Sequence, residues 1–318
     1  MKVIKYNESY KEIWDLFVSK AKNTHFFFYR DYMEYHKDRF EDFSLMFWDD
    51  KNKLIAIMPA SVKDNVVTSH GGLTFGGILS DKKMTASIML VIFDTIKEFL
   101  LENNIKELVY KPLPYIYHKY PAQEDLYALF RNGAELFRRD ISSVILLPER
   151  YAYSKGRKWM CSKGRKNRIE VEESTDFDSF ISLENYVLNK YHNTVAVHLP
   201  SELKMLAERF PNNIKLFLGK KDNNILSGAV VFENENIVHV QYMANSDKGR
   251  EYGALDVVID KLITEVYSNR IYFDFGMSNE NMGTYLNEGL IHQKEGFGGR
   301  GVVYDFYKIR MGGENEKY

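Results

Sequence analysis

Carboxylate and imidazole side chains in the second half of the chain have the chemistry needed to transfer protons near neutral pH. Asp274 lies in the run 271–276, where β-branched and aromatic residues predict a buried strand that breaks at a glycine. Desolvation disfavours a charged carboxylate there, which suits a general base acting directly or through water; holding a backbone turn or orienting a substrate are equal alternatives. His192 and His198 flank 193–197 and are further candidates for proton transfer, although such histidines more often serve as hydrogen-bonded scaffolding.

Tyr285, Glu288 and Lys294 follow within a short distance along the chain. We expect a helix through Tyr285, and on a helix residues three apart share a face, so Tyr285 and Glu288 would lie together. A tyrosine on an amphipathic helix is equally compatible with a half-buried packing role, and Lys294 with a solvated lysine.

The elements expected to position these residues form two similar halves. In the first half we predict helices at 8–21, 84–101 and 125–133, and strands at 43–48, 54–63, 105–111 and 142–147. In the second half we predict helices at 177–191, 201–210, 252–267 and through Tyr285, and strands at 214–219, 225–232, 237–244, 270–276 and 302–309. The stretch 149–168, rich in Lys, Arg, Gly and Ser, is the predicted boundary between domains 1–150 and 151–318.

Composition agrees with two domains, since 318 residues with 45% hydrophobic and 14% aromatic content can fill two cores. The net charge of −1 gives no long-range field for capturing a polyanion, which argues against a general nucleic-acid binder. Cys161 is the only cysteine, so an internal disulfide is excluded and a structural thiol is expected. With no apolar run long enough to span a bilayer and no leader-like N-terminus, we expect a cytoplasmic protein.

Two short patterns near the C-terminus resemble those of a known superfamily. A spacing found in GNAT domains is reproduced by Asn281, Gly283, Tyr285, Gly289 and Leu290. The run 293–299 resembles the Phe-Lys-x-x-Phe-Gly stretch of the FemAB-like branch, with Gln293 in place of the aromatic. The chain thus resembles the FemAB-like branch of the GNAT acyltransferases. This implies an α+β fold of two tandem GNAT-like domains, each a mixed, mostly antiparallel sheet flanked by helices, with a V-shaped gap between two splayed parallel strands.

The resemblance implies an acyl-CoA co-substrate such as acetyl-CoA, with its pyrophosphate on the first backbone amides of a helix, and no metal. The candidate loop is 246–255, where Arg250 and Gly253 fit the family pattern and Leu255 replaces its last small residue. A solvated turn that caps a helix is an equal alternative. The predicted donor-binding residues are Gln241, Met243, Lys248, Gly249, Arg250, Gly253, Ala254 and Lys294.

Acyl transfer to an amine needs a deprotonated amine, a polarised carbonyl and a proton for the leaving group. Tyr285 matches the position of the tyrosine that protonates the leaving thiolate in many GNAT enzymes. The predicted catalytic residues are Asp274, Tyr285, Glu288, His198 and His192.

The glycine-rich segment 69–77 lacks the Gly-Lys-Ser/Thr ending of a P-loop, but its paired glycines allow close backbone approach to a ligand. The resemblance implies that the first domain helps to bind a nucleotide-linked sugar. Its predicted lining is His70, Thr74, Tyr110, Lys111, Tyr117 and His118, with Tyr115 and Tyr120 as further stacking aromatics. A rigid, proline-held turn at 111–115 is the alternative.

We therefore predict an N-acyltransferase that moves an acetyl or other small acyl group from acyl-CoA to the amine of an amino sugar, for a surface polysaccharide. Some FemAB-like relatives instead take an aminoacyl group from charged tRNA and commonly carry a coiled-coil arm, for which we find no heptad pattern. The seven Lys and Arg of 155–168 leave that reading open, because they can neutralise phosphates of tRNA, a nucleotide-sugar or CoA, or form a charged linker. A tRNA-dependent ligase of the peptidoglycan-precursor type and a non-catalytic GNAT-like binding module remain the alternatives.

Overall fold

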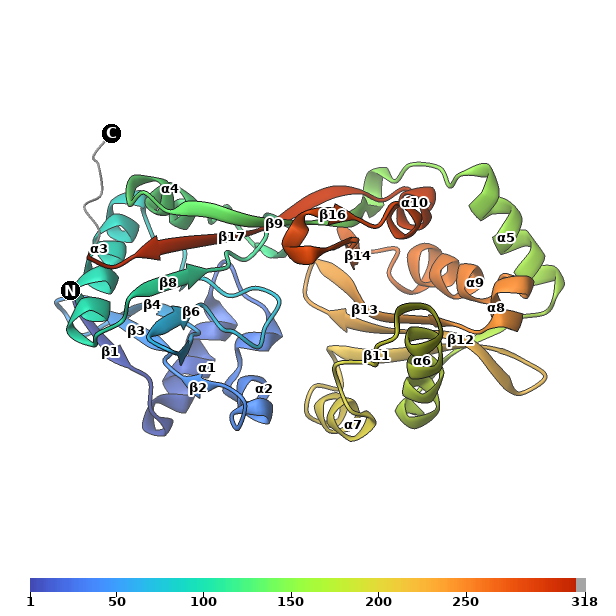
Figure 1. Ribbon diagram of the computed structural model, residues 1–318, viewed down its shortest axis with the longest axis horizontal. Coiled ribbons are helices and arrows are strands. Elements are labelled where there is room, and N and C mark those ends of the chain that lie inside the picture. Colours follow the sequence, from blue (N-terminus) through green and yellow to red (C-terminus); the bar gives the residue numbers. More distant parts are fainter. Residues whose placement is uncertain (313–318) are drawn as a thin grey trace. The chain divides into compact units, whose positions relative to one another are not determined.

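The computed structural model describes residues 1–312 and divides the chain into two compact units (Figure 1). Unit 1 comprises Met1–Asp140 together with Val303–Tyr318, and unit 2 comprises Ile141–Val302. This division differs from the predicted boundary at 150 and 151. The reason is that β17 (Arg300–Arg310) pairs with β8 (Glu107–Tyr110) of unit 1, so the last strand returns to the first unit.

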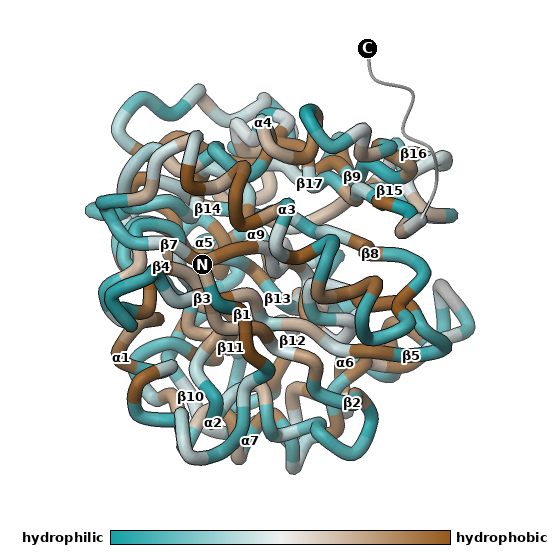
Figure 2. The backbone as a smooth tube through the Cα atoms, turned by 90° about the vertical axis from the view of Figure 1, so that its left-hand side faces the viewer, coloured by the Kyte–Doolittle hydropathy of each residue, from teal (hydrophilic) through white to brown (hydrophobic). Residues whose placement is uncertain are grey.

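Unit 1 contains two groups of strands. An antiparallel sheet has the order β1 (Lys2–Lys5), β3 (Leu45–Trp48), β4 (Leu54–Met58) and β7 (Leu79–Ser80). A second group has the order β17, β8, β6 (Val66–Thr68), β5 (Ser61–Lys63) and β2 (Glu41–Asp42), in which β6 and β8 are parallel. Figure 2 shows the apolar colour of β1 beside hydrophilic connecting turns.

The helices of unit 1 are α1 (Lys11–Lys20), α2 (Arg30–Met33), α3 (Ala86–Glu102) and α4 (Glu124–Arg131) among the described residues. Helix α3 starts where the Thr85 hydroxyl accepts a hydrogen bond from the Ile88 amide, an N-cap that satisfies one of the unpaired first-turn donors. Its buried face, which includes Phe93 and Ile96, packs into a core with Leu45 and Phe47. Burial of this helical stripe against the strands is the main stabilising term of the unit.

Unit 2 has one sheet in the order β10, β11, β12, β13, β14 and β9, in which β13 and β14 are parallel and the other neighbours antiparallel. These strands are β9 (Glu135–Leu146), β10 (Glu170–Ser174), β11 (Ile214–Lys221), β12 (Asn224–Glu233), β13 (Ile237–Asn245) and β14 (Tyr272–Met277). The mixed, mostly antiparallel α+β character of both units confirms the predicted fold class.

Two helices of unit 2, α6 (Phe177–His192) and α9 (Ala254–Lys261), cover opposite faces of this sheet. On β12, a Cβ at Gly228 would lie 2.8 Å from the ring of Phe180 on α6. The next residue, Ala229, packs in the core with Val258 of α9. Because successive strand residues point to opposite faces, α6 and α9 must lie on different sides. Helix α7 (Pro200–Arg209) packs beside α6.

The basic stretch that we predicted as a boundary is instead helix α5 (Lys155–Lys166), packed against α9. The Ser154 hydroxyl caps its first turn by accepting from the Arg157 amide. Gly164 permits the close approach, because a Cβ there would lie 2.3 Å from Val257. Arg157 adds an ion pair with Asp256 at 2.6 Å. A run of charges therefore reads as a linker in the sequence, although one stripe of it is buried.

The predicted helix through Tyr285 is wrong. Asn281, Met282 and Gly283 all have positive φ, at 50°, 56° and 92°, which an α-helix cannot accommodate. Tyr285 instead lies in the short strand β16 (Tyr285–Leu286), paired with β15 (Asn279–Glu280). Helix α10 (Glu288–Gly296) begins after Asn287, whose side-chain oxygen accepts from the Leu290 amide.

Candidate active site

The parallel strands β13 and β14 pair over a short distance and then separate. Their register runs from Ile237 opposite Tyr272 to His239 opposite Asp274. Beyond His239, β13 continues to Asn245 in register with β12, while β14 ends at Met277. Unit 2 therefore has the gap between splayed parallel strands that we expected.

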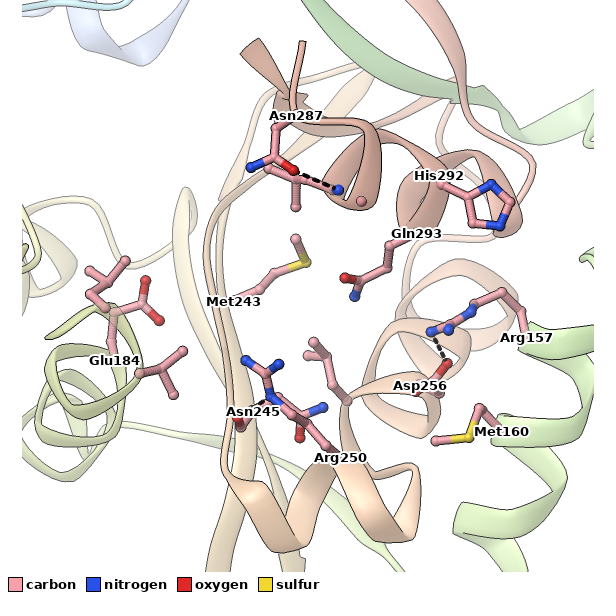
Figure 3. A pocket seen from close by; sticks show the side chains of 15 residues that line it. Arg157, Met160, Glu184, Met243, Asn245, Arg250, Asp256, Asn287, His292 and Gln293 are labelled. Atoms are coloured by element: carbon pink, nitrogen blue, oxygen red, sulfur yellow. Dashed lines mark hydrogen bonds and ion pairs between the residues drawn. The ribbon is translucent and has the colours of Figure 1, made fainter. Parts of the chain in front are cut away.

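A cavity of about 670 Å³ lies at this gap (Figure 3). It is lined by residues of α5, α6, β13, α8, α9 and α10 with their flanking turns: Arg157, Met160, Glu184, Val187, Leu188, Met243, Asn245, Arg250, Leu255, Asp256, Asn287, Gly289, Leu290, His292 and Gln293. In Figure 3, Glu184 lies on one side of the strand that carries Met243, and Arg157 and Asp256 lie on the other. Since α6 and α9 cover opposite faces, the cavity connects the two faces of the sheet along the edge of β13 that has left β14.

Asp274 and Lys294 hold the end of β14 beside the gap. Asp274 is fully buried and accepts hydrogen bonds from the Ser142 hydroxyl and, at 2.9 Å, from the Gly276 amide; His239 Nδ1 lies 2.8 Å from its other oxygen. The Lys294 ammonium donates to the carbonyls of Gly276 at 2.9 Å and Met277 at 2.7 Å. Burial lowers the pKa of Lys294 to about 8, against the opposing pull of Asp274. Asp274 thus has the turn-holding role that was one of its alternatives, and neither side chain lines the cavity.

On the α9 side, the cavity wall carries positive charge. Arg157 pairs with Asp256, and burial still raises the pKa of the Asp256 carboxyl above its ordinary value. The Arg250 guanidinium lies 4.2 Å from the centre of the Tyr191 ring. The amide oxygen of Asn245 is buried and accepts no hydrogen bond from the described residues. This side of the cavity therefore presents groups that suit a polar, anionic ligand.

On the α6 side, the cavity wall carries a buried carboxylate, Glu184, which is only 5% exposed. Its Oε2 atom has no hydrogen-bond partner within residues 1–312. Burial raises the pKa of Glu184 to about 7. We did not predict this residue, because a glutamate in an amphipathic helix normally faces solvent. The signal available was its position one turn before Val187 and Leu188, on the apolar stripe of α6.

The predicted donor residues fall into several places. Met243 and Arg250 line the cavity, Gln241 is half-buried on β13, and Lys248 lines a neighbouring cavity of about 490 Å³. Lys294 sits behind the gap, where it holds the end of β14. The remaining three are buried: Gly249, Gly253 and Ala254.

The predicted pyrophosphate loop is occupied by the protein's own groups. It forms helix α8 (Asp247–Tyr252), in which the Ser246 hydroxyl accepts from the Gly249 amide at 3.0 Å. Asp247 adds a negative charge to the first turn, where it contacts Tyr186, Lys190 and Tyr191. Gly253 serves packing, because a Cβ there would lie 2.5 Å from the Met160 carbonyl of α5. Pyrophosphate binding at this loop stays a prediction.

The predicted catalytic residues are not gathered in one place. Tyr285 and Glu288 are both exposed, and they flank Asn287, which lines the cavity, without sharing a helical face. His198 is buried, with Nδ1 2.6 Å from the hydroxyl of Tyr242 on β13. The side chain of His192 lies outside the described part of the structure.

In unit 1, the predicted acceptor residues are largely internal. Tyr110 is fully buried, donates to Asp125 at 2.8 Å and accepts from the Ile78 amide at 2.7 Å, so stacking on a ligand is excluded for this residue. Tyr117 is buried against Tyr304, with their hydroxyls 3.2 Å apart.

The loop residues of unit 1 divide between the interior and a surface cavity. His70 is buried with φ of 64°, and Thr74 is half-buried. Lys111 is buried, donates to the Leu73 carbonyl, and has its pKa lowered to about 7 by burial. His118 lines a cavity of about 390 Å³ together with the exposed rings of Tyr115 and Tyr120.

The described residues contain no group of three His, Cys, Asp or Glu side chains arranged to hold a metal ion. None of the helices within residues 1–312 is both long enough and apolar enough to cross a membrane. Cys161 is a buried free thiol, and burial raises its pKa to about 12, as a structural thiol requires.

Comparison with known proteins supports the fold. No family model matches the chain, and no curated protein matches it. Among solved structures, it is similar to FemX, with a TM-score of 0.69 and 11% identity over 98% of this chain and 97% of that one. It is also similar to L-PGS from Bacillus licheniformis, with a TM-score of 0.62 and 11% identity over 98% and 94%.

A further solved structure, a tandem GNAT protein from the clavulanic acid biosynthesis pathway, matches with a TM-score of 0.50 and 9% identity over 99% of both chains. The predicted resemblance is thereby confirmed at the level of the fold: the chain has two tandem GNAT-like domains of the FemAB-like kind.

Proposed function

We propose that this protein is an N-acyltransferase whose unit 2 transfers an acyl group to an amine. The observation that carries the proposal is the cavity at the β13–β14 gap, which is lined from both faces of the sheet. Such a cavity lets a donor enter from the α9 side and an acceptor from the α6 side, so that their reacting atoms meet between the strands. The charges agree, with Arg157 and Arg250 on one side and Glu184 on the other.

For the donor, we propose an acyl-CoA carrying a small acyl group such as acetyl. The apolar side chains of Met243, Leu255 and Leu290 line a passage suited to a pantetheine arm, and Arg250 supplies charge for a phosphate. One structure with this fold, the tandem GNAT protein, is described by its title as lacking AcCoA.

For the acceptor, we propose the amine of an amino sugar, nucleotide-linked and used for a surface polysaccharide. The supporting observation is the cavity of unit 1 that holds His118 with the exposed rings of Tyr115 and Tyr120. Aromatic faces of this kind stack on sugars and bases.

A second candidate, an aminoacyl transferase that uses charged tRNA, is favoured by helix α5. Lys155, Lys158, Lys166 and the following Arg168 are exposed, and Trp159 beside them is 61% exposed. Since α5 also contributes Arg157 and Met160 to the cavity, a polyanion bound on α5 would end close to the reaction site.

Isothermal titration of the purified protein with acetyl-CoA, free CoA and uncharged tRNA separates these candidates. Micromolar binding of acetyl-CoA that weakens in Arg250→Ala, and not in the control Arg131→Ala on α4, supports the CoA-dependent enzyme. Binding of tRNA alone, with a steep dependence on salt, supports the second candidate. A folded protein that binds none of the three would contradict both and leave a non-catalytic binding module.

A further inference from the structure

We propose that Glu184 is the general base that removes a proton from the acceptor ammonium on the α6 side of the cavity. This inference rests on the proposed function and deepens it, since it assigns the base and requires an acceptor that is cationic before it reacts.

The position of Glu184 meets the geometric requirement for this role. It projects from α6 into the cavity, on the face of the sheet opposite α9. Its neighbours on α6, Val187 and Leu188, are apolar and keep water away from it. A carboxylate that is almost fully buried, with an oxygen that lacks a partner among the described residues, is costly unless a cationic ligand completes it.

The charged and titratable groups around Glu184 leave this role open. On β13, Tyr242 is its titratable neighbour, and the Tyr242 hydroxyl is engaged by His198 at 2.6 Å. Across the cavity, α5 and α9 contribute Arg157 and Asp256, which pair with each other.

The remaining charged lining groups are Arg250, which stacks on Tyr191, and His292 of α10. No ion pair with Glu184 occurs within the described residues, and burial is the cause that raises its pKa to about 7. A base with that pKa is about half ionised at neutral pH, which suits proton transfer there.

The reaction balances with Glu184 as the base. The carboxylate takes one proton from the acceptor R–NH₃⁺, and the free amine lone pair attacks the carbonyl carbon of the donor. A C–N bond forms, the C–S bond of the thioester breaks, and its electron pair leaves on sulfur. The second proton of the nitrogen passes to the leaving thiolate, and Glu184 returns its proton to solvent. The products are an amide, a free thiol and one proton.

The other buried carboxylate near the gap is unsuited to this task. Asp274 is fully buried, and its two oxygens are engaged by Ser142, Gly276 and His239. A proton acceptor must reach the acceptor nitrogen, and Glu184 has the oxygen available for that contact.

The first test uses Glu184→Gln, which keeps the shape and removes the proton-accepting charge. Glu208→Gln, the same change at an exposed site on α7, is the matched control. With acetyl-CoA as donor and glucosamine as acceptor, thiol release should fall about 100- to 10,000-fold in Glu184→Gln. The affinity for acetyl-CoA should stay unchanged, and the rise of wild-type kcat with pH around 7 should disappear. Wild-type kcat and pH profile in Glu184→Gln would overturn the inference.

The second test needs no turnover. In protein labelled with ¹³C at the glutamate carboxyl carbons, the resonance missing from Glu184→Gln should titrate near pH 7. Glucosamine should lower that midpoint, because a bound ammonium favours the carboxylate, whereas glucose should leave it unchanged. A midpoint at the ordinary glutamate value, or equal midpoints with the two sugars, would overturn the inference.

The two tests also separate this inference from the proposed function. Failure to bind acetyl-CoA or to release thiol in the wild-type protein would defeat the proposed function, and the titration would still report on Glu184. Transfer at equal rates in the wild-type protein and Glu184→Gln would defeat the inference alone.

Discussion

Each unit contains one short pair of parallel strands in its larger group, and the two pairs end differently. In unit 2, β13 and β14 separate after His239 and Asp274, and a cavity of about 670 Å³ lies beyond that point. In unit 1, β6 and β8 pair from Val66 opposite Glu107 to Thr68 opposite Val109, also over three residues.

The loop 69–77 then bridges the corresponding position in unit 1. The Ser69 hydroxyl accepts from the Lys111 amide at 2.7 Å, and the Gly76 amide donates to the Lys111 carbonyl at 2.8 Å. The glycines of this loop serve close packing within the protein. The comparison teaches that a shared arrangement of strands does not make two equal sites, because the segment after the third residue pair decides whether a ligand can enter.

The largest expected effect comes from closing the open gap. Met243→Trp places an indole in the passage beside β13, so acetyl-CoA binding should weaken at least a thousandfold, about 4 kcal/mol. Isothermal titration measures this. Met282→Trp, at an exposed turn, should bind as the wild-type protein does. Unchanged binding by a folded Met243→Trp would place the donor elsewhere.

The next effect concerns the point at which the strands separate. Asp274→Asn removes a buried charge that holds Gly276, Ser142 and His239, so the free energy of unfolding should fall by roughly 3 kcal/mol. Urea denaturation measures the change. Asp222→Asn, in an exposed turn, should have almost no effect. If Asp274→Asn were as stable as the wild-type protein but inactive, Asp274 would belong to the chemistry.

A third effect separates function from stability on the α6 side. The pKa of Glu184 rises from 4.5 unfolded to about 7 folded, so ionising it opposes folding. The resulting loss of stability develops as the pH rises from 4.5 to 7 and is complete above 7. Glu184→Gln should therefore be more stable than the wild-type protein at pH 8, by up to about 3 kcal/mol, and equal to it at pH 4.

Thermal unfolding at the two pH values measures that difference. Glu208→Gln, which replaces an exposed glutamate, should show no gain at either pH. Equal stability of Glu184→Gln and the wild-type protein at pH 8 would show that the folded protein does not hold this carboxyl at a raised pKa.

The smallest effect tests the closed pair of unit 1. A Cβ at Gly76 would lie 2.0 Å from the Ser69 carbonyl oxygen, so Gly76→Ala must displace the bridging loop and should cost about 2 kcal/mol. Gly156→Ala, on the exposed side of α5, meets its nearest atom at 3.9 Å and should stabilise by about 0.5 kcal/mol. Equal stabilities for the two variants would show that the loop does not hold the pair closed.

Much of the fold could be predicted, because α3, α6, β12 and β13 carry clear apolar periodicities. The errors have local causes. Positive φ at Asn281 and Met282 is set by the turn and not by a residue type that demands it, so the break before α10 was missed. The charges of α5 hid its buried stripe.

The site was harder to predict because burial depends on partners distant in the sequence. Tyr110 looked like a ligand contact but is fully buried, whereas Glu184 looked like a surface residue and lies in the cavity. Met243 and Arg250 were identified through the family resemblance, which locates the donor side better than the acceptor side.

The path of the chain through the two units has a consequence for biosynthesis. Unit 2 is a continuous segment, Ile141–Val302, whereas unit 1 needs β17 from the end of the chain to pair with β8. A ribosome therefore completes every strand of unit 2 before it delivers the last strand of unit 1. Until then β8 keeps an unpaired edge, the kind of edge that recruits other chains. The part of the protein that is made first is the last that can finish folding.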